Sequence, residues 1–295
     1  MVVAEVGDRL STAYCGRLLA DLGATVIRIV EAVASGGGRR TSADYEAYLH
    51  GGKQSVSQLS RLSAVDAVIC DSGPAAATAR SALVDSPDLV TVTMTDFGTT
   101  GPDAQTPASE LTLQAESGIV ALQRAEDRPP VMIGVPLSEL TCALNGAIGV
   151  VHAMLSRDAG GGAIDVDVSR FESLVGLQQY PWLYPQIDSH MVYAPPDPTP
   201  GIEKAADGYV CIVAMVPDQW TALKKMVGIE ALDDPRYEDA AIRGRHRREV
   251  SRLLRTFTGK RTVAELVDLG AEHRVPITPV ATAKTAPRLD PYATR

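Results

Sequence analysis

Glu139 holds the position in this sequence best suited to nucleophilic or general-base chemistry. Pro136 opens the string PLSELTCALNGAIG, whose apolar spacing predicts a helix over 136–156 with this carboxylate in its first turns. The positive end of the helix dipole favours an ionised carboxylate, which can attack an acyl group or accept a proton. Acidic residues also stabilise helix starts without any catalytic role, and the local pattern allows both interpretations. Cys142, one turn later, is a second candidate, as a reactive thiol.

Glu110 and Lys53 are further candidates for chemistry. Glu110 begins a second predicted helix, over 109–123, and has the same two interpretations as the first carboxylate. Lys53 follows two glycines in HGGKQSV, where its ammonium group and free backbone N–H groups would suit a phosphate. The alternative is a solvated surface lysine, because the P-loop spacing is absent here and GxGxxG does not occur in the chain.

Cysteine and histidine spacing predicts neither a metal centre nor a disulfide framework. The 4 cysteines form no CxxC pair, and the 5 histidines are dispersed. His152 lies in an apolar helical stretch and is expected to pack in the core. Residues 243–261 are locally basic, which indicates a solvated helix face or a surface for a nucleotide phosphate or a partner subunit.

Composition places the chain among ordinary globular proteins. It has 295 residues, of which 45% are hydrophobic and 22% charged, with a mean hydropathy of +0.01. The net charge of −8 and the pI near 5.2 argue against a nucleic-acid partner, which usually selects a basic face. We expect a cytoplasmic protein, because the sequence has no run of about 18 apolar residues and its first residues do not resemble a signal peptide.

Short apolar strands alternate with the helices that carry these residues. Strands are predicted at 25–30, 67–70, 89–94 and 163–168, and a further helix at 11–22. This alternation predicts an α/β fold with a parallel sheet. The turn FGTTGP at 97–102 follows the third of these strands, at the sheet edge where open α/β folds generally bind ligands.

Residues 179–200 differ in composition and contain six prolines, which is typical of a stiff linker. Beyond them, strands are predicted at 208–215 and 275–280, with helices at 217–226, 245–257 and 262–269. The sequence therefore predicts a second, smaller α/β domain.

Seven strings, in collinear order, resemble the class III coenzyme A transferases, the family that includes formyl-CoA transferase, carnitine CoA-transferase and α-methylacyl-CoA racemase. The strings are YCGRLLADLGATVIRIVE at 14–31, FGTTGP at 97–102, LQAESGIVAL at 113–122, IGVPLSELTCALNGAIGVVHAMLSR at 133–157, GGGAIDVDVSRFESLVG at 160–176, ADGYVCIVAMVPDQW at 206–220 and RVPITPVAT at 274–282.

The resemblance implies a Rossmann-like large domain with a smaller α/β domain. We assign 1–185 to the large CoA-binding domain, 186–202 to the linker, 203–272 to the small domain and 273–295 to a segment returning towards the large domain. It also implies an interlocked homodimer, although the sequence lacks the family's long C-terminal tail after Pro287. A heteromer with a homologous subunit is the alternative assembly.

The resemblance also implies roles for six residues. Glu139 matches the catalytic aspartate of the family, one methylene longer, and Glu110 matches an acidic position of the transferase site. The implied contacts to coenzyme A are the backbone of Ser11, the ammonium of Lys53, Asp71 at a position usually held by asparagine, and Arg80, one residue out of register. No metal and no tightly bound cofactor are expected, since acyl-CoA is the substrate.

The predicted function is transfer of coenzyme A between an acyl-CoA and a carboxylic acid, with Glu139 as the nucleophile. One alternative is an acyl-CoA racemase in which Glu139 and Glu110 act as an acid/base pair. Against it, Ser109 stands where the racemases carry a histidine. A second alternative is an inactive subunit paired with an active homologue, as the altered nucleophile would suggest.

Overall fold

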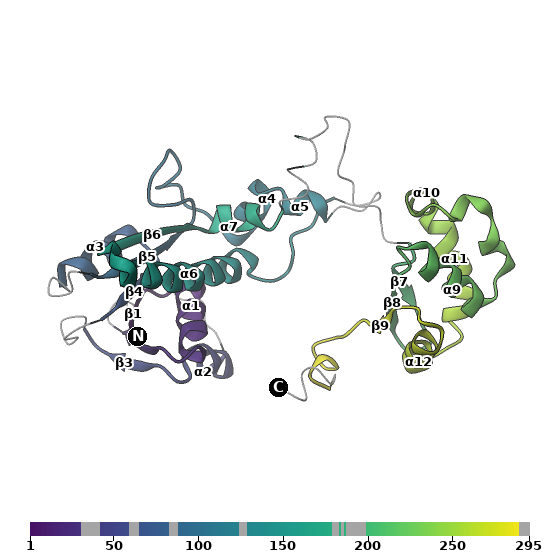
Figure 1. Cartoon of the computed structure of the whole chain (residues 1–295), viewed down its shortest axis with the longest axis horizontal. Helices are drawn as coiled ribbons and strands as arrows, with labels where there is room; N and C mark the ends of the chain where they lie inside the picture. The colour runs from purple at the N-terminus through teal and green to yellow at the C-terminus, as the bar shows by residue number, and fades with distance from the viewer. Residues whose placement is uncertain are drawn as a thin grey trace. The chain divides into compact units, whose positions relative to one another are not determined.

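A computed structural model describes residues 1–30, 42–58, 65–82, 88–123, 129–178, 183, 186 and 199–288. The chain divides into two compact units, Met1–Met191 and Val192–Arg295, which Figure 1 draws with their elements labelled. The predicted linker at 186–202 lies mostly outside the described residues, so its conformation stays a prediction.

The first unit is built on a six-stranded sheet in the order β3-β2-β1-β4-β5-β6, in which every neighbouring pair is parallel. Its strands are β1 (Val2–Val6), β2 (Thr25–Ile29), β3 (Gln54–Val56), β4 (Ala67–Cys70), β5 (Val90–Thr95) and β6 (Ile164–Ser169). The predicted parallel α/β sheet is thereby confirmed. The strand order reverses between β1 and β4, and ligands bind such sheets at the carboxyl ends of the strands beside this switch point.

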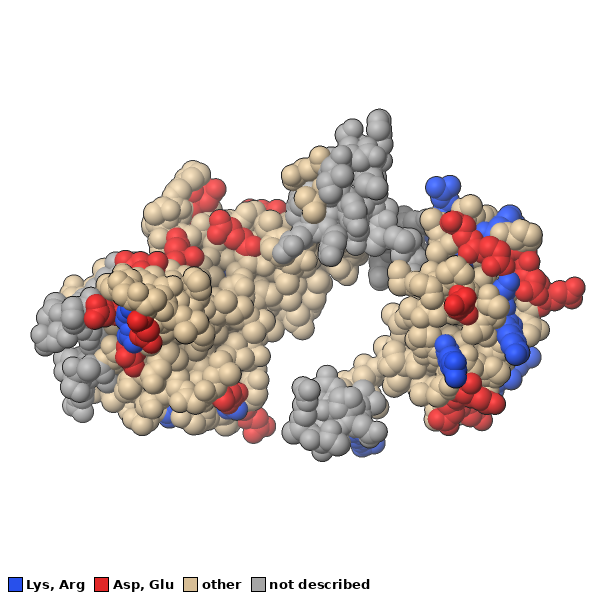
Figure 2. All heavy atoms as spheres, viewed as in Figure 1, with Lys and Arg blue, Asp and Glu red and all other residues tan. Residues whose placement is uncertain are grey.

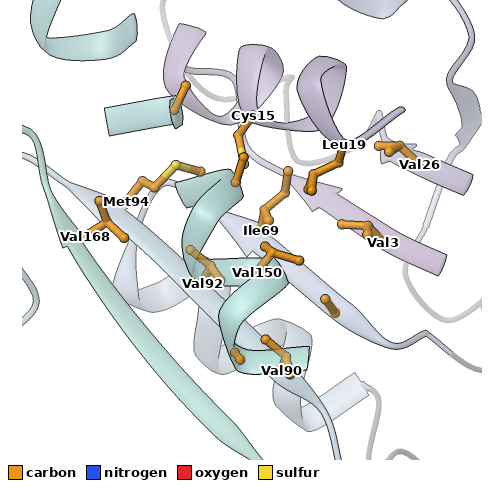
Figure 3. Packing of buried hydrophobic residues seen from close by; sticks show 14 of the residues in the cluster. Val3, Cys15, Leu19, Val26, Ile69, Val90, Val92, Met94, Val150 and Val168 are labelled. Atoms are coloured by element: carbon orange, nitrogen blue, oxygen red, sulfur yellow. The ribbon is translucent and has the colours of Figure 1, made fainter. Parts of the chain in front are cut away.

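Helices cover both faces of this sheet. They are α1 (Leu10–Asp21), α2 (Ala43–His50), α3 (Gly73–Ala82), α4 (Glu110–Glu116), α5 (Ile119–Leu122), α6 (Leu137–Ser156) and α7 (Arg170–Gly176). On one face, Cys15 and Leu19 of α1 and Val150 of α6 pack against strand residues such as Ile69 and Val92, as Figure 3 shows. A second core on the other face includes Ala79 of α3. Apolar packing on both faces explains the continuous apolar runs of the central strands.

The sequence patterns missed strand β1 because Glu5 interrupts its apolar run. Glu5 is nevertheless buried, and its carboxylate lies 2.6 Å from the ammonium of Lys53. A buried carboxylate is tolerated when it is paired in this way, so the central strand can carry a charge. Strand β3 was also missed, since it is only three residues long.

Helix α6 is buried on one side only. Its small residues pack on α1, α7 and strands β5 and β6. The opposite side exposes apolar residues and His152, which is therefore not a core histidine. By length and composition alone, Leu137–Gly161 could cross a membrane, but 44% of that window is buried in the domain core. This is the behaviour of a core helix in a layered domain.

The predicted helix over 109–123 is two helices rather than one. Helix α4 ends at Glu116 and α5 begins at Ile119, with Gly118 between them at φ 86°. A left-handed conformation suits glycine and breaks the α-helical hydrogen-bond ladder. The break leaves Glu110 at the start of a short helix whose N-cap is Ser109.

The second unit combines a small antiparallel sheet with four α-helices among its described residues. The sheet has the order β7-β8-β9. Its elements are β7 (Ile202–Lys204), β8 (Tyr209–Ile212), α9 (Pro217–Val227), α10 (Ala240–Arg245), α11 (Arg247–Thr258), α12 (Val263–His273) and β9 (Ile277–Pro279). Residues 277–279 thus form the third strand of this sheet, where a strand is predicted at 275–280. The assignment of 273–295 to a segment returning towards the large domain stays a prediction. The predicted helix over 245–257 is divided at His246.

Arg243 is buried, so the interpretation of the basic stretch 243–261 as a solvated helix face is wrong for this residue. Its side chain is buried and donates hydrogen bonds to the carbonyl oxygens of Thr199 (2.8 Å), Tyr237 (2.6 Å) and Ala214 (2.7 Å). The guanidinium also lies over the ring of Trp220, at 4.3 Å from its centroid. Burial lowers the pKa of Arg243. This arginine holds together three segments of the second unit.

Candidate active site

Glu139 lies in the first turn of α6 with its carboxylate directed at the start of α1. Its Oε2 atom accepts a hydrogen bond of 2.9 Å from the backbone N–H of Ser11, the second residue of α1. The first N–H groups of a helix have no partner within the helix, so this bond satisfies one of them. The carboxylate is thus close to the positive ends of two helix dipoles, which stabilise its negative charge.

Two arginines and a second carboxylate complete the immediate surroundings of Glu139. Arg170 Nε lies 3.2 Å from Oε2 of Glu139, and Arg9 Nη1 lies 3.7 Å from Oε1. Both arginines also bind Asp96, with Arg170 Nη1 at 2.7 Å and Arg9 Nη1 at 3.1 Å from Oδ1. We call Arg9, Asp96, Glu139 and Arg170 the four-charge cluster. Its formal charges sum to zero.

The fold explains why these side chains meet. Arg9 is the N-cap of α1 and follows β1, Asp96 follows β5, and Arg170 follows β6. Parallel strands end at the same edge of a sheet, so residues directly after them are brought together. Helix α6 packs against β5 and β6 and brings Glu139 to that edge.

Arg170 is the buried member of the cluster and Arg9 the accessible one. The side chain of Arg170 is 1% exposed, against 40% for Arg9 and 17% for Glu139. Burial acts to lower the pKa of Arg170, but the charges of Glu139 and Asp96 outweigh it and raise the pKa above its ordinary value. A second guanidinium nitrogen donates to Ser11 Oγ at 2.9 Å. The Nε atom is buried and lacks a hydrogen bond of acceptable geometry despite its closeness to Glu139.

Glu110, the first residue of α4, binds Ser138, the residue that precedes the candidate nucleophile Glu139. Its Oε1 accepts from the backbone N–H of Ser138 at 3.0 Å, and its Oε2 accepts from the Ser138 hydroxyl at 2.5 Å. Gln114 Nε2 also donates to Oε1 at 2.7 Å. The carboxylate therefore caps the first turn of α6, and its geometry is that of a positioning residue.

Asp71 shapes the loop between β1 and α1. Its Oδ2 accepts hydrogen bonds from the backbone N–H groups of Asp8 (2.8 Å) and Arg9 (3.0 Å). Burial raises the pKa of Asp71, while these two hydrogen bonds act to lower it. Gly7 approaches so closely that a Cβ atom there would lie 2.3 Å from Oδ2. The structure thus gives Asp71 a role in fixing the backbone of Arg9, and its predicted contact with coenzyme A stays a prediction.

Lys53 lies apart from the cluster, in the buried ion pair with Glu5. Its side chain is 1% exposed, and its ammonium also donates to the Ala13 carbonyl at 2.7 Å. Burial lowers the pKa of Lys53, an effect opposed by the charge of Glu5. Binding of a CoA phosphate would require this ammonium to leave its partners, so the predicted role depends on a rearrangement.

Ser11 and Arg80 are the two remaining predicted contacts to coenzyme A. The Ser11 amide is engaged by Glu139, so it can bind a CoA group only by giving up that hydrogen bond. Arg80 lies in α3, and its side chain is outside the described part of the structure. Both assignments stay predictions.

Cys142 lies one turn after Glu139 but is fully buried. Burial raises the pKa of its thiol to about 12, with the nearby guanidinium of Arg170 acting in the opposite direction. A thiol with this pKa is neutral at physiological pH and is a poor nucleophile. The described residues contain no group of three or more histidine, cysteine, aspartate or glutamate side chains placed to hold a metal ion.

The sequence reasoning missed Arg9, Asp96 and Arg170. A usable signal was present, because Asp96 and Arg170 each come two residues after the end of a predicted strand. In a parallel sheet such residues share the ligand-binding edge. Arg9 was harder to find, since the strand before it was not recognised.

Comparison with known proteins bears on the fold and the family of the chain. The fold is similar to the crystal structure of a CAIB/BAIF family protein from Brucella suis, with a TM-score of 0.81 and 23% identity, covering 100% of this chain and 86% of that one. A succinyl-CoA:mesaconate CoA-transferase from Haloarcula hispanica is 27% identical over 322 aligned positions, covering 94% of this chain and 78% of the relative.

A further relative, a probable CoA-transferase from Mycobacterium tuberculosis, is 29% identical over 208 residues. That match covers 66% of this chain and 26% of the relative, so the chain corresponds to about a quarter of that longer protein. The sequence profile of CoA-transferase family III matches residues 77–295. This range includes both candidate carboxylates, Glu110 and Glu139, and strands β5 and β6 of the large sheet. The chain belongs to CoA-transferase family III.

Proposed function

We propose that the protein transfers coenzyme A between an acyl-CoA and a carboxylic acid, with Glu139 as the nucleophile. The observation that carries this proposal is the placement of the Glu139 carboxylate. It is partly exposed, held by the Ser11 amide and two arginines, and located at the ligand-binding edge of the sheet. Membership of the family supports coenzyme A as the group transferred.

In the proposed reaction the Glu139 carboxylate attacks the thioester carbonyl of an acyl-CoA. The C–S bond breaks, the CoA thiolate leaves, and a mixed anhydride forms on the glutamate. The thiolate then attacks the glutamyl carbonyl, which releases the first carboxylate and leaves a glutamyl-CoA thioester. An acceptor carboxylate attacks that thioester to give an anhydride again, and the thiolate attacks its other carbonyl to release the new acyl-CoA.

The surrounding groups orient this nucleophile. The Ser11 amide and the guanidinium of Arg170 both contact Oε2 of Glu139. These contacts hold the second oxygen, Oε1, towards the more exposed Arg9. A fixed carboxylate needs less reorganisation to reach the reacting carbonyl, which is a main source of rate in two-substrate reactions.

We further propose that the protein is a homodimer. Helix α6 exposes a row of large apolar side chains, including Ile148 at 65% exposure; its other members are Leu144, Val151 and Leu155. Figure 2 shows few charged side chains where α6 crosses the surface of the first unit. Continuous apolar surface of this kind is typical of protein interfaces. Light scattering over a dilution series tests this proposal, and a monomer at all concentrations would contradict it.

Trapping of the acyl-enzyme tests the proposed reaction. The protein is incubated with a panel of acyl-CoA thioesters, treated with hydroxylamine or borohydride, digested and analysed by mass spectrometry. We expect modification on the peptide that contains Glu139 and none in Glu139→Gln, which keeps the size of the side chain but cannot attack a thioester. Absence of any adduct would contradict the proposal and favour a non-catalytic subunit.

An isotope experiment separates transfer from racemisation. A 2-methylacyl-CoA carrying deuterium at its α-carbon keeps the label during transfer, because no bond to that carbon is broken. A racemase exchanges it with solvent through its acid/base pair. Exchange of the label without adduct formation would favour Glu139 and Glu110 as such a pair.

A further inference from the structure

The four-charge cluster loses its balance at one stage of the proposed reaction. Arg9 and Arg170 carry two positive charges, and Asp96 and Glu139 carry two negative charges. When Glu139 is an anhydride or a thioester, its negative charge is gone. Asp96 is then the only carboxylate of the cluster, and one arginine charge lacks a partner.

The exposure of the two arginine side chains decides which of them can bind an anion from solvent with this unpaired positive charge. Arg170 is buried, is bound to Asp96 at 2.7 Å and donates to Ser11, although its Nε has no hydrogen bond. Arg9 also donates to Asp96, from Nη1 to Oδ1 at 3.1 Å and from Nη2 to Oδ2 at 3.3 Å, but 40% of its side chain is exposed. Its distance to Oε1 of Glu139 is 3.7 Å, longer than a hydrogen bond. An anion that approaches from solvent therefore meets Arg9 first.

We propose that Arg9 binds the carboxylate of the acid substrate while Glu139 is acylated. This inference rests on the proposed function, since it concerns the charge of Glu139 during catalysis. A guanidinium has five N–H groups, and Arg9 uses two of them for Asp96, so its other N–H groups can hold the acid beside the glutamyl carbonyl. In the resting protein the ionised Glu139, 3.7 Å from Arg9, repels a second carboxylate at this position. The site therefore favours the acid only after the acyl group has arrived.

At each step of the proposed reaction, the bond that breaks determines which group near Arg9 carries the negative charge. Thiolate attack on the anhydride breaks the bond between the glutamyl carbonyl carbon and the bridging oxygen, and the released carboxylate carries the electron pair. That carboxylate has the charge which Glu139 has lost, and Arg9 neutralises it. Exchange for an acceptor carboxylate leaves the total charge unchanged, and attack of the acceptor on the thioester transfers its negative charge to the leaving thiolate.

Glu139→Gln reproduces the charge of the acylated state without any acyl-CoA. Its amide is neutral and similar in size to the carboxylate, so the cluster gains one unit of positive charge. We expect acetate, used as the probe, to bind this variant about tenfold or more tighter than the wild type, because a charge pair in a partly exposed site contributes on the order of 1.4 kcal/mol or more. Calorimetric titration at constant ionic strength, with chloride as the balancing salt, measures the affinity.

Arg9→Met in the Glu139→Gln background should return the acetate affinity to the wild-type level. Arg157→Met in the same background is the matched control, because Arg157 also bridges two carboxylates, Asp66 and Asp158. Asp66 lies directly before β4, at the amino end of the sheet and away from the cluster. The control should keep the tighter binding. Arg9→Lys, which keeps the charge, should retain part of it, and circular dichroism establishes that each variant is folded.

The outcomes separate this inference from the proposed function. If Glu139→Gln binds acetate no tighter than the wild type, or if the gain survives Arg9→Met, the assignment of Arg9 is wrong. An acyl adduct on Glu139 together with no gain in acetate affinity would overturn this inference alone. A gain that depends on Arg9, in a protein that forms no adduct with any acyl-CoA, would support the anion site and overturn the proposed function.

Discussion

The carboxylate of Glu110 binds both the backbone amide and the hydroxyl of Ser138, at 3.0 Å and 2.5 Å. Ser138 is the second residue of α6, and Glu139 is the third. One acidic residue, carried by α4, thus caps the helix turn that presents the other. The two carboxylates suggested by the sequence have different tasks in this geometry, because Glu110 fixes the backbone while Glu139 faces the arginines.

Glu110→Ala should lower the free energy of unfolding by about 1–2 kcal/mol, as expected for loss of a helix cap. Glu110→Gln keeps one acceptor oxygen and should lose roughly half as much. Both variants should slow transfer, because the first turn of α6 positions Glu139. Urea unfolding and steady-state rates check these effects. If Glu110→Gln removes one limb of the pH–rate profile, Glu110 exchanges a proton and is more than a positioning residue.

Much of the large domain could be predicted from the sequence because its strands are short apolar runs between helices. Ala67–Cys70 was predicted with its observed bounds, and the strands at 25–30, 89–94 and 163–168 were predicted to within about a residue at each end. Strand β1 was not, since the charge of Glu5 is acceptable in a central strand only through its pairing with Lys53. That pairing joins residues 48 positions apart, so no local pattern reveals it.

The candidate site was predictable in part for a related reason. The helix start around Glu139 is a local feature and was found from local sequence. The cluster around it joins four segments through contacts such as Arg170 with Asp96, which are 74 positions apart. Strand order decides which loops meet, and strand order requires the complete sheet, including the missed β1.

Glu139→Asp should lower the rate of transfer, by on the order of 10²-fold for a shift of the reacting group near 1 Å. The contacts of Oε2 with the Ser11 amide and with Arg170 are made by the longer side chain. Shortening it by one methylene withdraws the carboxylate from both. The rate of acyl-enzyme formation, measured in single turnovers, checks this expectation. A faster reaction would show that the surroundings still fit an aspartate.

Gly7→Ala should destabilise the protein by more than about 2 kcal/mol, since backbone strain of this kind alone costs roughly 1–3 kcal/mol. Gly7 has φ 149°, and an added Cβ would also collide with Asp71. Gly23→Ala is the matched control, because Gly23 has φ 94° and nothing within 4 Å of an added Cβ. The excess loss in Gly7→Ala, and a lower affinity for acetate in the Glu139→Gln background, would reflect displacement of the Arg9 loop. Equal losses in the two variants would contradict this.

Arg243→Met should destabilise the second unit strongly, by roughly 3–5 kcal/mol, because it removes a buried charged donor from several acceptors. Methionine can still pack on Trp220, but the carbonyl oxygens of Thr199, Tyr237 and Ala214 lose their hydrogen bonds. Hydrogen exchange measures the loss of protection unit by unit. Arg236→Met is the control, since that arginine is 52% exposed and pairs with Asp234 at the surface. Its effect should be much smaller, because an exposed ion pair contributes little to stability.

Because of His50, the free energy of unfolding should fall as the pH is lowered from about 6.5 to about 4. Burial, followed by the charges of Lys53 and Arg28, lowers the pKa of His50 to about 4. Over this range the unfolded chain binds a proton that the folded protein excludes, so acid favours unfolding by up to about 3 kcal/mol. His50→Asn lacks this contribution, and its unfolding free energy should fall less steeply than that of the wild type over the same range. His273→Asn, at the end of α12 in the second unit, controls for the general effect of losing an imidazole. Urea titrations at pH 7, 5.5 and 4.5 give the slope of the unfolding free energy against pH. Equal slopes for His50→Asn and the wild type would show that the imidazole is not held neutral beside Lys53.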